Sequence, residues 1–101
     1  MTRNKRTMEN EVEGYLTRQV EALGGMSVKI DTVIGFPDRL ILLPQGVSAL
    51  VETKRPMGGR VSDVQLVTHS ILHRIGHNPR IVCTKEDVDA LLFQLYHSQE
   101  S

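Results

Sequence analysis

Three ionisable side chains in this sequence lie next to chain-breaking residues and suit phosphate chemistry. Asp38 follows Gly35-Phe36-Pro37, and after thirteen intervening residues Glu52 and Lys54 close a run of apolar residues. Carboxylate oxygens are ligands that hard divalent cations prefer, and an ammonium group can orient water or a phosphate oxygen. The residue types therefore suit a metal-assisted hydrolysis, provided that the fold brings the three side chains together.

A β-hairpin is predicted to bring them together. Residues 39–43 and 47–54 have the apolar content of strands, and Pro44-Gln45-Gly46 is typical of a three-residue hairpin turn with glycine where a left-handed residue is needed. Pairing the strands across that turn places Asp38 opposite Glu52. We therefore expect both carboxylates at the same end of the hairpin.

The alternation of side chains along a strand then decides which of them share a face. Glu52 and Lys54 are two positions apart and leave the sheet on the same side as Asp38, whereas Thr53 points to the other side. Two ionised carboxylates ~4–5 Å apart repel by roughly 3–4 kcal/mol at an effective dielectric constant of about 20. Because a small domain tolerates this poorly, we expect a cation between them, and oxygen-only ligation favours Mg²⁺ or Mn²⁺ over Zn²⁺.

The rest of the chain supplies the elements of one α/β domain in the order α-β-β-β-α-β-α. Residues 1–8 form a short basic arm, and the domain spans 9–97. Because the hairpin strands are apolar on both faces, helices are expected to cover the sheet on each side. The predicted elements are a helix from Glu9 ended by Gly24-Gly25, strands at 26–34, 39–43 and 47–54, a helix from Ser62 with apolar positions Val64, Val67, Ile71, Leu72 and Ile75, a strand at 80–84, and a helix capped by Thr84 and Asp87.

Composition limits the classes of protein to which the chain can belong. With 101 residues, 40% of them apolar, and a formal net charge of zero, it fits a small globular domain without general attraction to nucleic acid. The single cysteine, Cys83, allows no internal disulfide and is expected to be a small buried side chain. No apolar run approaches the ~20 residues of a membrane span, and no secretory signal is found, so an intracellular, cytoplasmic protein is expected.

Four segments together resemble a known nuclease family. They are Phe36 to Pro44, Val51 to Pro56, Ser62 to Gln65 and the region of Gly76. The chain resembles the VRR-NUC branch of the PD-(D/E)XK nucleases over about residues 9–92, and is similar to stand-alone members from bacteriophages. The resemblance implies a restriction-endonuclease-like core, a mixed sheet flanked by helices, and a Mg²⁺- or Mn²⁺-dependent DNA endonuclease in the cytoplasm of a bacterial host.

The resemblance also implies roles for individual residues. Asp38 and Glu52 would hold the metal together with the backbone carbonyl of Thr53, and Lys54 would orient or help activate the attacking water. Gln65 corresponds to a glutamine at the rim of the active site, although it can equally complete a capping box with Ser62.

The family further contributes a glutamate from the first helix, and three residues compete for that role. Glu9 and Glu13 are four apart on one helix face, whereas Glu11 points away, and Glu13 is preferred over Glu9. Any of these carboxylates can also simply complement the dipole of the helix N-terminus. Arg55 and Arg60 are the cations expected to contact DNA phosphates.

A zinc site is not expected, although His69, His73 and His77 have helical spacing. Gly76 should end the helix before His77, and Arg74 and Arg80 lie beside the histidines.

Together with the family resemblance, the sequence favours a structure-selective endonuclease, acting as a homodimer on branched DNA such as Holliday junctions. The alternatives are a nuclease that processes flaps or ends, and a DNA-binding module without activity.

Overall fold

The described residues confirm the predicted order of elements. The computed structural model of the chain describes residues 5–54 and 62–97, and describes side chains from residue 10 onward. The elements are α1 (Lys5–Ala22), β1 (Met26–Lys29), β2 (Arg39–Leu42), the short 3₁₀ turn η1 (Pro44–Gly46), β3 (Ser48–Thr53), α2 (Asp63–Arg74), β4 (Arg80–Val82) and α3 (Lys85–His97). None of the described helices is long and apolar enough to cross a membrane.

The four strands form one mixed sheet in the order β1-β2-β3-β4. β2 runs antiparallel to both of its neighbours, β1 and β3, whereas β4 is parallel to β3 and is reached through α2. The predicted hairpin turn is confirmed, since Gln45 and Gly46 have φ values of 67° and 79° and the amide of Leu43 donates to the carbonyl of Val47 at 2.8 Å. Its register pairs Arg39 with Val51, so Asp38 and Glu52 come next to each other in the ladder, as predicted.

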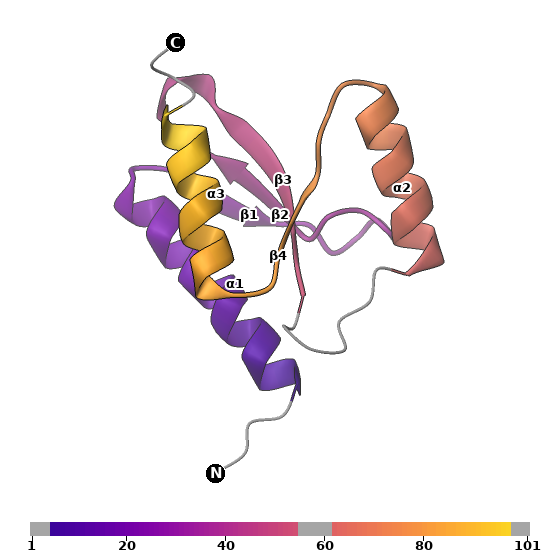
Figure 1. The fold of residues 1–101 in the computed structure, drawn as a ribbon, viewed down its shortest axis with the longest axis horizontal. Helices are drawn as coiled ribbons and strands as arrows, with labels where there is room; N and C mark the ends of the chain where they lie inside the picture. The colour runs from indigo at the N-terminus through magenta and orange to yellow at the C-terminus, as the bar shows by residue number, and fades with distance from the viewer. Residues whose placement is uncertain (1–4, 55–61, 98–101) are drawn as a thin grey trace.

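Helices α1 and α3 cover one face of this sheet (Figure 1). Their apolar stripes follow the predicted helical spacing, and the side chains that they bury pack against alternate residues of β2, β3 and β4. The buried core consists of Val12, Leu16, Val20, Ile41, Leu43, Val51, Val82, Val88, Leu91 and Leu92. This core fixes which face of each strand is turned away from the helices, because a shift of one residue would expose every buried strand side chain.

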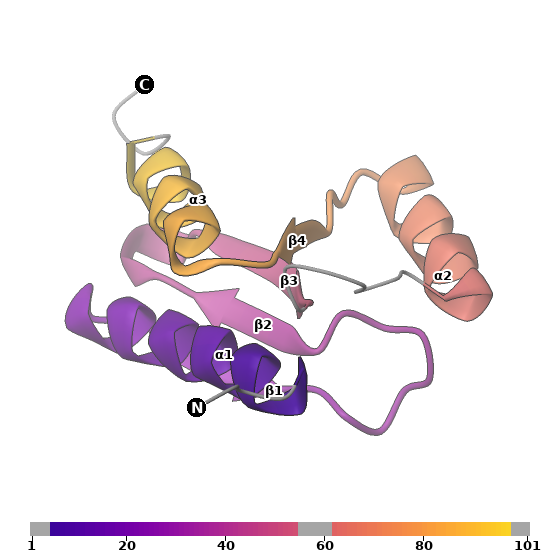
Figure 2. The same ribbon diagram turned by 60° about the horizontal axis from the view of Figure 1, so that its bottom comes forward.

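Helix α2 corrects the expectation that helices cover both faces of the sheet. It makes only slight contact with the other helices and strands, and of its apolar residues only Leu72 is buried. Figure 2 shows α2 standing apart from α1 and α3. The periodic apolar pattern predicted the helix correctly, but periodicity does not say whether a partner for the apolar stripe exists within the same chain.

The strands are shorter than predicted, most clearly the first. β1 ends at Lys29 because its partner β2 begins only at Arg39, to which Lys29 is paired. Residues 30–38 instead form a loop, in which the amide of Ile30 donates to the carbonyl of Asp38 at 2.8 Å. The last strand likewise ends at Val82, so Cys83 lies beyond it and is only partly buried.

The helix ends agree with the capping predictions, with one difference at the N-terminus. α1 begins at Lys5 rather than near Glu9, so part of the expected basic arm is helical, and residues 1–4 lie outside the described residues. Thr84 and Asp87 form the predicted capping box of α3, with N to O distances of 3.0 and 3.2 Å. Gly24, with φ 86°, follows the end of α1, as predicted.

Alanine substitutions at Gly35 and Gly46 test whether the loop before Asp38 packs against α2. Both have positive φ, 82° and 79°, but a Cβ atom at Gly35 would lie 2.5 Å from Cγ1 of Val64, whereas one at Gly46 would meet nothing within 4 Å. We expect Gly46→Ala to lower the free energy of unfolding by about 1–2 kcal/mol, the cost of a left-handed alanine, and Gly35→Ala to lower it further. Urea unfolding of both variants measures the difference, and equal losses would contradict the packing of this loop on α2.

Candidate active site

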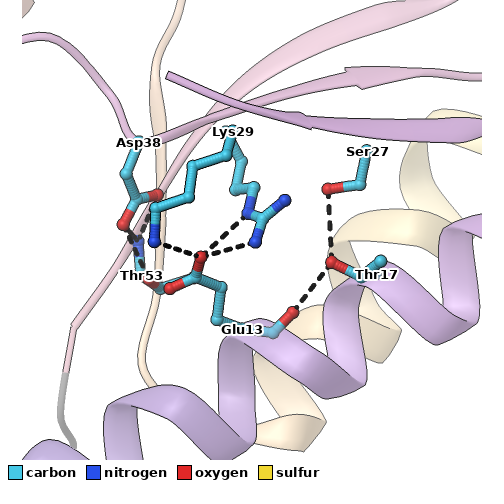
Figure 3. Close-up of polar contacts among 7 residues, drawn as sticks. Glu13, Thr17, Ser27, Lys29, Asp38 and Thr53 are labelled. Carbon is cyan, nitrogen blue, oxygen red and sulfur yellow. Dashed lines mark hydrogen bonds and ion pairs between the residues drawn. The ribbon is translucent and has the colours of Figure 1, made fainter. Parts of the chain in front are cut away.

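The carboxylate of Asp38 is oriented by Thr53. Asp38 ends the loop that precedes β2, and its Oδ2 accepts a hydrogen bond from Thr53 Oγ1 at 2.8 Å, while the backbone amide of Thr53 donates a longer one to Oδ1 at 3.3 Å (Figure 3). Strand alternation predicted that the Thr53 side chain turns away from the site, and only its backbone carbonyl was expected to contribute. The hydroxyl reaches Asp38 because Asp38 lies just outside the regular strand, where alternation no longer dictates its direction.

Glu52, Lys54 and Gln65 form a connected group. Lys54 Nζ lies 3.5 Å from Glu52 Oε2 and donates to Gln65 Oε1 at 3.0 Å. Gln65 completes the predicted capping box of α2, since its Oε1 also accepts from the amide of Ser62 at 3.0 Å. Gln65 therefore completes the capping box and also contacts Lys54, because the N-terminus of α2 is beside the end of β3. Its place at the rim of an active site stays a prediction.

The carboxylate of Glu13 accepts hydrogen bonds from two positively charged side chains. Its Oε2 accepts hydrogen bonds from Arg39 Nη2 at 2.6 Å and Nε at 3.0 Å, and from Lys29 Nζ at 3.2 Å (Figure 3). Arg39 and Glu13 are largely buried, whereas Lys29 is half exposed. Lys29 and Arg39 were not among the residues predicted from the sequence. The available signal was their direct pairing across β1 and β2, on the sheet face that α1 covers.

The pKa values of Asp38, Glu52 and Glu13 are shifted in different directions by their surroundings. Burial raises the pKa of Asp38, and the nearby Glu13 carboxylate raises it further. Burial also raises the pKa of Glu52, as does the charge of Asp38, against the opposing effect of Lys54. For Glu13 burial acts in the same direction, but the hydrogen bonds from Arg39 and Lys29 outweigh it and hold the pKa below its ordinary value. Asp38 and Glu52 are thus the two carboxyls whose ionised forms are disfavoured, although Lys54 offsets part of this effect at Glu52.

Asp38 and Glu52 also fit the donor set of a divalent cation. Glu52 Oε1 is buried and has no hydrogen-bond partner among the described residues, and a metal ion would satisfy it. No group of three histidine, cysteine, aspartate or glutamate residues gathers closely enough to hold a metal within the described part of the chain. The carboxylate of Glu13 is instead hydrogen-bonded to Arg39 and Lys29, and its role as a metal ligand stays a prediction. The second candidate from α1, Glu9, has no described side chain, and Arg55 and Arg60 lie outside the described residues.

The three histidines are not assembled into a metal site. Gly76, with φ 97°, follows the end of α2 as predicted, and His77 lies beyond it, where its amide donates to the carbonyl of Leu72 at 2.8 Å. His69 is on the same face of α2 as Gln65, four residues further along. Burial lowers the pKa of His69, and the charge of Lys54 lowers it further. Both effects favour the neutral form of this imidazole, which lies near Lys54 of the candidate site.

Two comparisons with known proteins match most of the chain. The protein named "Putative nuclease p44" of Acyrthosiphon pisum secondary endosymbiont phage 1 is 35% identical over 86 residues, covering 83% of this chain and 90% of that protein. A solved VRR_NUC domain superposes with a TM-score of 0.75 at 32% identity, covering 84% of this chain and 94% of that one. The chain belongs to the VRR-NUC family. No family model matches this VRR-NUC protein, but the structural match confirms its PD-(D/E)XK-like fold.

The raised pKa of Glu52 generates a prediction about stability. A carboxyl whose pKa is higher in the folded than in the unfolded state destabilises the folded state when ionised, and this cost disappears as the pH falls through the folded pKa. Glu52→Gln in the metal-free protein should therefore be at least as stable as the unaltered VRR-NUC protein at pH 7, and its relative advantage should shrink at mildly acidic pH. Urea unfolding between pH 7 and pH 5 tests this.

Glu21→Gln is the matched control, since Glu21 is exposed on α1. It should change the free energy of unfolding little at either pH. A Glu52→Gln variant that is markedly less stable than the unaltered protein at pH 7 would show that the Glu52–Lys54 ion pair outweighs the cost of burying the carboxylate.

Proposed function

We propose that this VRR-NUC protein is a Mg²⁺- or Mn²⁺-dependent endodeoxyribonuclease that acts as a homodimer on branched DNA such as Holliday junctions. The observation that carries the proposal is the group of the buried Glu52 and the partly buried Asp38 and Lys54 at one edge of a nuclease fold. A phage relative named as a nuclease supports it and favours the cytoplasm of a bacterial host as the place of action.

Asp38 and Glu52 are proposed to hold the metal, together with the backbone carbonyl of Thr53. When bound, the metal supplies positive charge that stabilises the developing negative charge on the phosphate oxygens. The hydroxyl of Thr53 keeps the Asp38 carboxylate in one orientation, because its hydrogen bond leaves that carboxylate fewer rotamers to sample. Glu52 Oε1, without a partner among the described residues, is the free acceptor of this pair.

Lys54 is proposed to position the attacking water. Its ammonium group is held between Glu52 and Gln65, so it points toward the carboxylates and keeps further N–H donors for water or a phosphate oxygen. In the hydrolysis, the water oxygen forms a bond to phosphorus, the bond from phosphorus to one deoxyribose oxygen breaks, and that oxygen takes a proton. Gln65 contributes by fixing the direction of Lys54.

The preference for branched DNA is proposed from size and symmetry. A chain of 101 residues with zero net charge has little surface for selecting a substrate apart from its catalytic edge. A two-fold dimer presents two identical sites at a fixed separation, which suits the symmetry of a four-way junction and allows paired incisions. Arg55 and Arg60 are proposed to add local phosphate contacts.

Two rival functions are flap or end processing and DNA binding without cleavage. The presence of Asp38, Glu52 and Lys54 together favours cleavage over DNA binding alone.

Alanine substitutions at these three residues test the catalytic assignment. Asp38→Ala, Glu52→Ala and Lys54→Ala should each abolish metal-dependent cleavage while leaving the circular dichroism spectrum unchanged, and Glu21→Ala should cleave as the unaltered protein does. The Asp38 and Glu52 variants should also lose the rise in melting temperature that Mg²⁺ or Mn²⁺ gives by binding the folded state. Full cleavage by purified Glu52→Ala would refute the assignment.

A panel of DNA structures tests the substrate class. Four-way junctions should be cut faster than flapped, nicked and linear duplexes of the same sequence, in the presence of Mg²⁺ or Mn²⁺. Linear duplex cut as readily as a junction would remove the junction preference and leave the nuclease standing. Faster cleavage of flaps would favour the end-processing alternative, and binding without any cleavage would favour the inactive module.

A further inference from the structure

Helix α2 has two distinct faces. One carries Gln65, His69 and Leu72 and turns toward Lys54 and the end of β3. The other, about 100° around the helix, is an apolar stripe in which every side chain is between 43% and 63% exposed. The residues of this stripe are Val64, Val67, Ile71 and Ile75. An amphipathic helix normally buries such a stripe, but apart from Gly35 beside Val64 the described part of the chain leaves this side of α2 uncovered.

One face of the sheet lacks a covering helix among the described residues. A helix that connects two parallel strands, as α2 connects β3 and β4, ordinarily packs back on the sheet. Here α1 and α3 lie on one face, and among the described residues no helix covers the other. That open face carries exposed apolar residues from three strands, namely Met26 and Val28 of β1, Leu42 of β2 and Ile81 of β4.

We infer that the α2 stripe and the open sheet face form the surface through which two copies of this chain associate. This inference rests on the homodimer of the proposed function and names its interface. A symmetric dimer uses the same surface on both copies, which must therefore complement itself. The surface does so because each copy offers a helix without a sheet and a sheet face without a helix.

The exposed apolar area supports a second copy as the occupant. Val33 and Ile34, in the loop whose Gly35 contacts Val64, extend the surface beside α2. Burying the exposed parts of these ten side chains would remove on the order of 500 Å² of apolar surface per copy, at roughly 100 Å² for a fully exposed aliphatic side chain. Since about 60% of an interface is apolar, the whole interface approaches the ~800 Å² per partner of stable complexes.

This surface also connects dimerisation to the active site. Ile81 pairs with Glu52 in the register of β3 and β4, so the open face ends at the catalytic edge. Gln65, which holds Lys54, belongs to the same helix as the stripe. A second copy packed against the stripe would therefore hold α2, and with it Gln65, in place against Lys54.

The double variant Val67→Asp and Ile71→Asp tests the interface. Both side chains are exposed, so two new charges should leave the fold of one copy intact while opposing association. Light scattering at tens of micromolar protein should give the unaltered chain at twice its mass of 11.3 kDa and the double variant as a monomer with the same circular dichroism spectrum. Phe93→Asp is the matched control, because Phe93 is 66% exposed, against 60% for Val67, but lies on α3. It should remain a dimer.

Met26→Lys provides an independent test on the sheet face, should the double variant fold poorly. It should weaken dimerisation at least tenfold, because Met26 is exposed at the start of β1. A monomeric unaltered protein, or a dimer that tolerates both the α2 variant and the β1 variant, would overturn the interface. A dimer that behaves as expected but cleaves no DNA would instead overturn the proposed nuclease and leave the interface standing.

Discussion

The burial of Asp38 and Glu52 at one edge of the sheet is the constraint on which the other features of the site depend. Burial raises the pKa of both carboxyls, and a neighbouring carboxylate raises each further, that of Glu13 for Asp38 and that of Asp38 for Glu52. The neighbouring groups respond in different ways. Thr53 donates a hydrogen bond to Asp38, and Lys54 pairs with Glu52. What remains is a negative site with a free carboxylate oxygen, and this is the arrangement that suits a divalent cation.

The third carboxylate shows how a similar residue can have a different role. Glu13 comes from α1 to the same region, but Arg39 and Lys29 neutralise it with three hydrogen bonds to one oxygen. Arg39 is the residue after Asp38, so the chain places a cation directly beside the carboxylate that it leaves free. Glu13 consequently ties α1 to β1 and β2, and stabilises the strand ends from which Asp38 projects.

Helix α2 links the chemistry of the site to its surroundings. Its N-terminal Gln65 caps the helix and holds Lys54, while a second face of the helix presents an apolar stripe. Because this helix makes only slight contact with the other elements, its position depends on the site at one side and on its environment at the other. A partner that covers the stripe would hold α2, and with it Gln65 and Lys54, in one position, so the proposed dimer would connect association to the proposed active site.

Much of this protein follows from its sequence alone. Helical and strand periodicity, Gly24, Gly76 and the capping boxes determined the order of elements, and the turn Pro44-Gln45-Gly46 determined the register that sets Asp38 opposite Glu52. These are local properties, since each depends on residues close together in the chain. Tertiary structure alone decided the partners of Glu13, the contact of Thr53 with Asp38 and the exposure of the α2 stripe. These depend on side chains distant in sequence, and on whether a covering element exists at all, which no local pattern records.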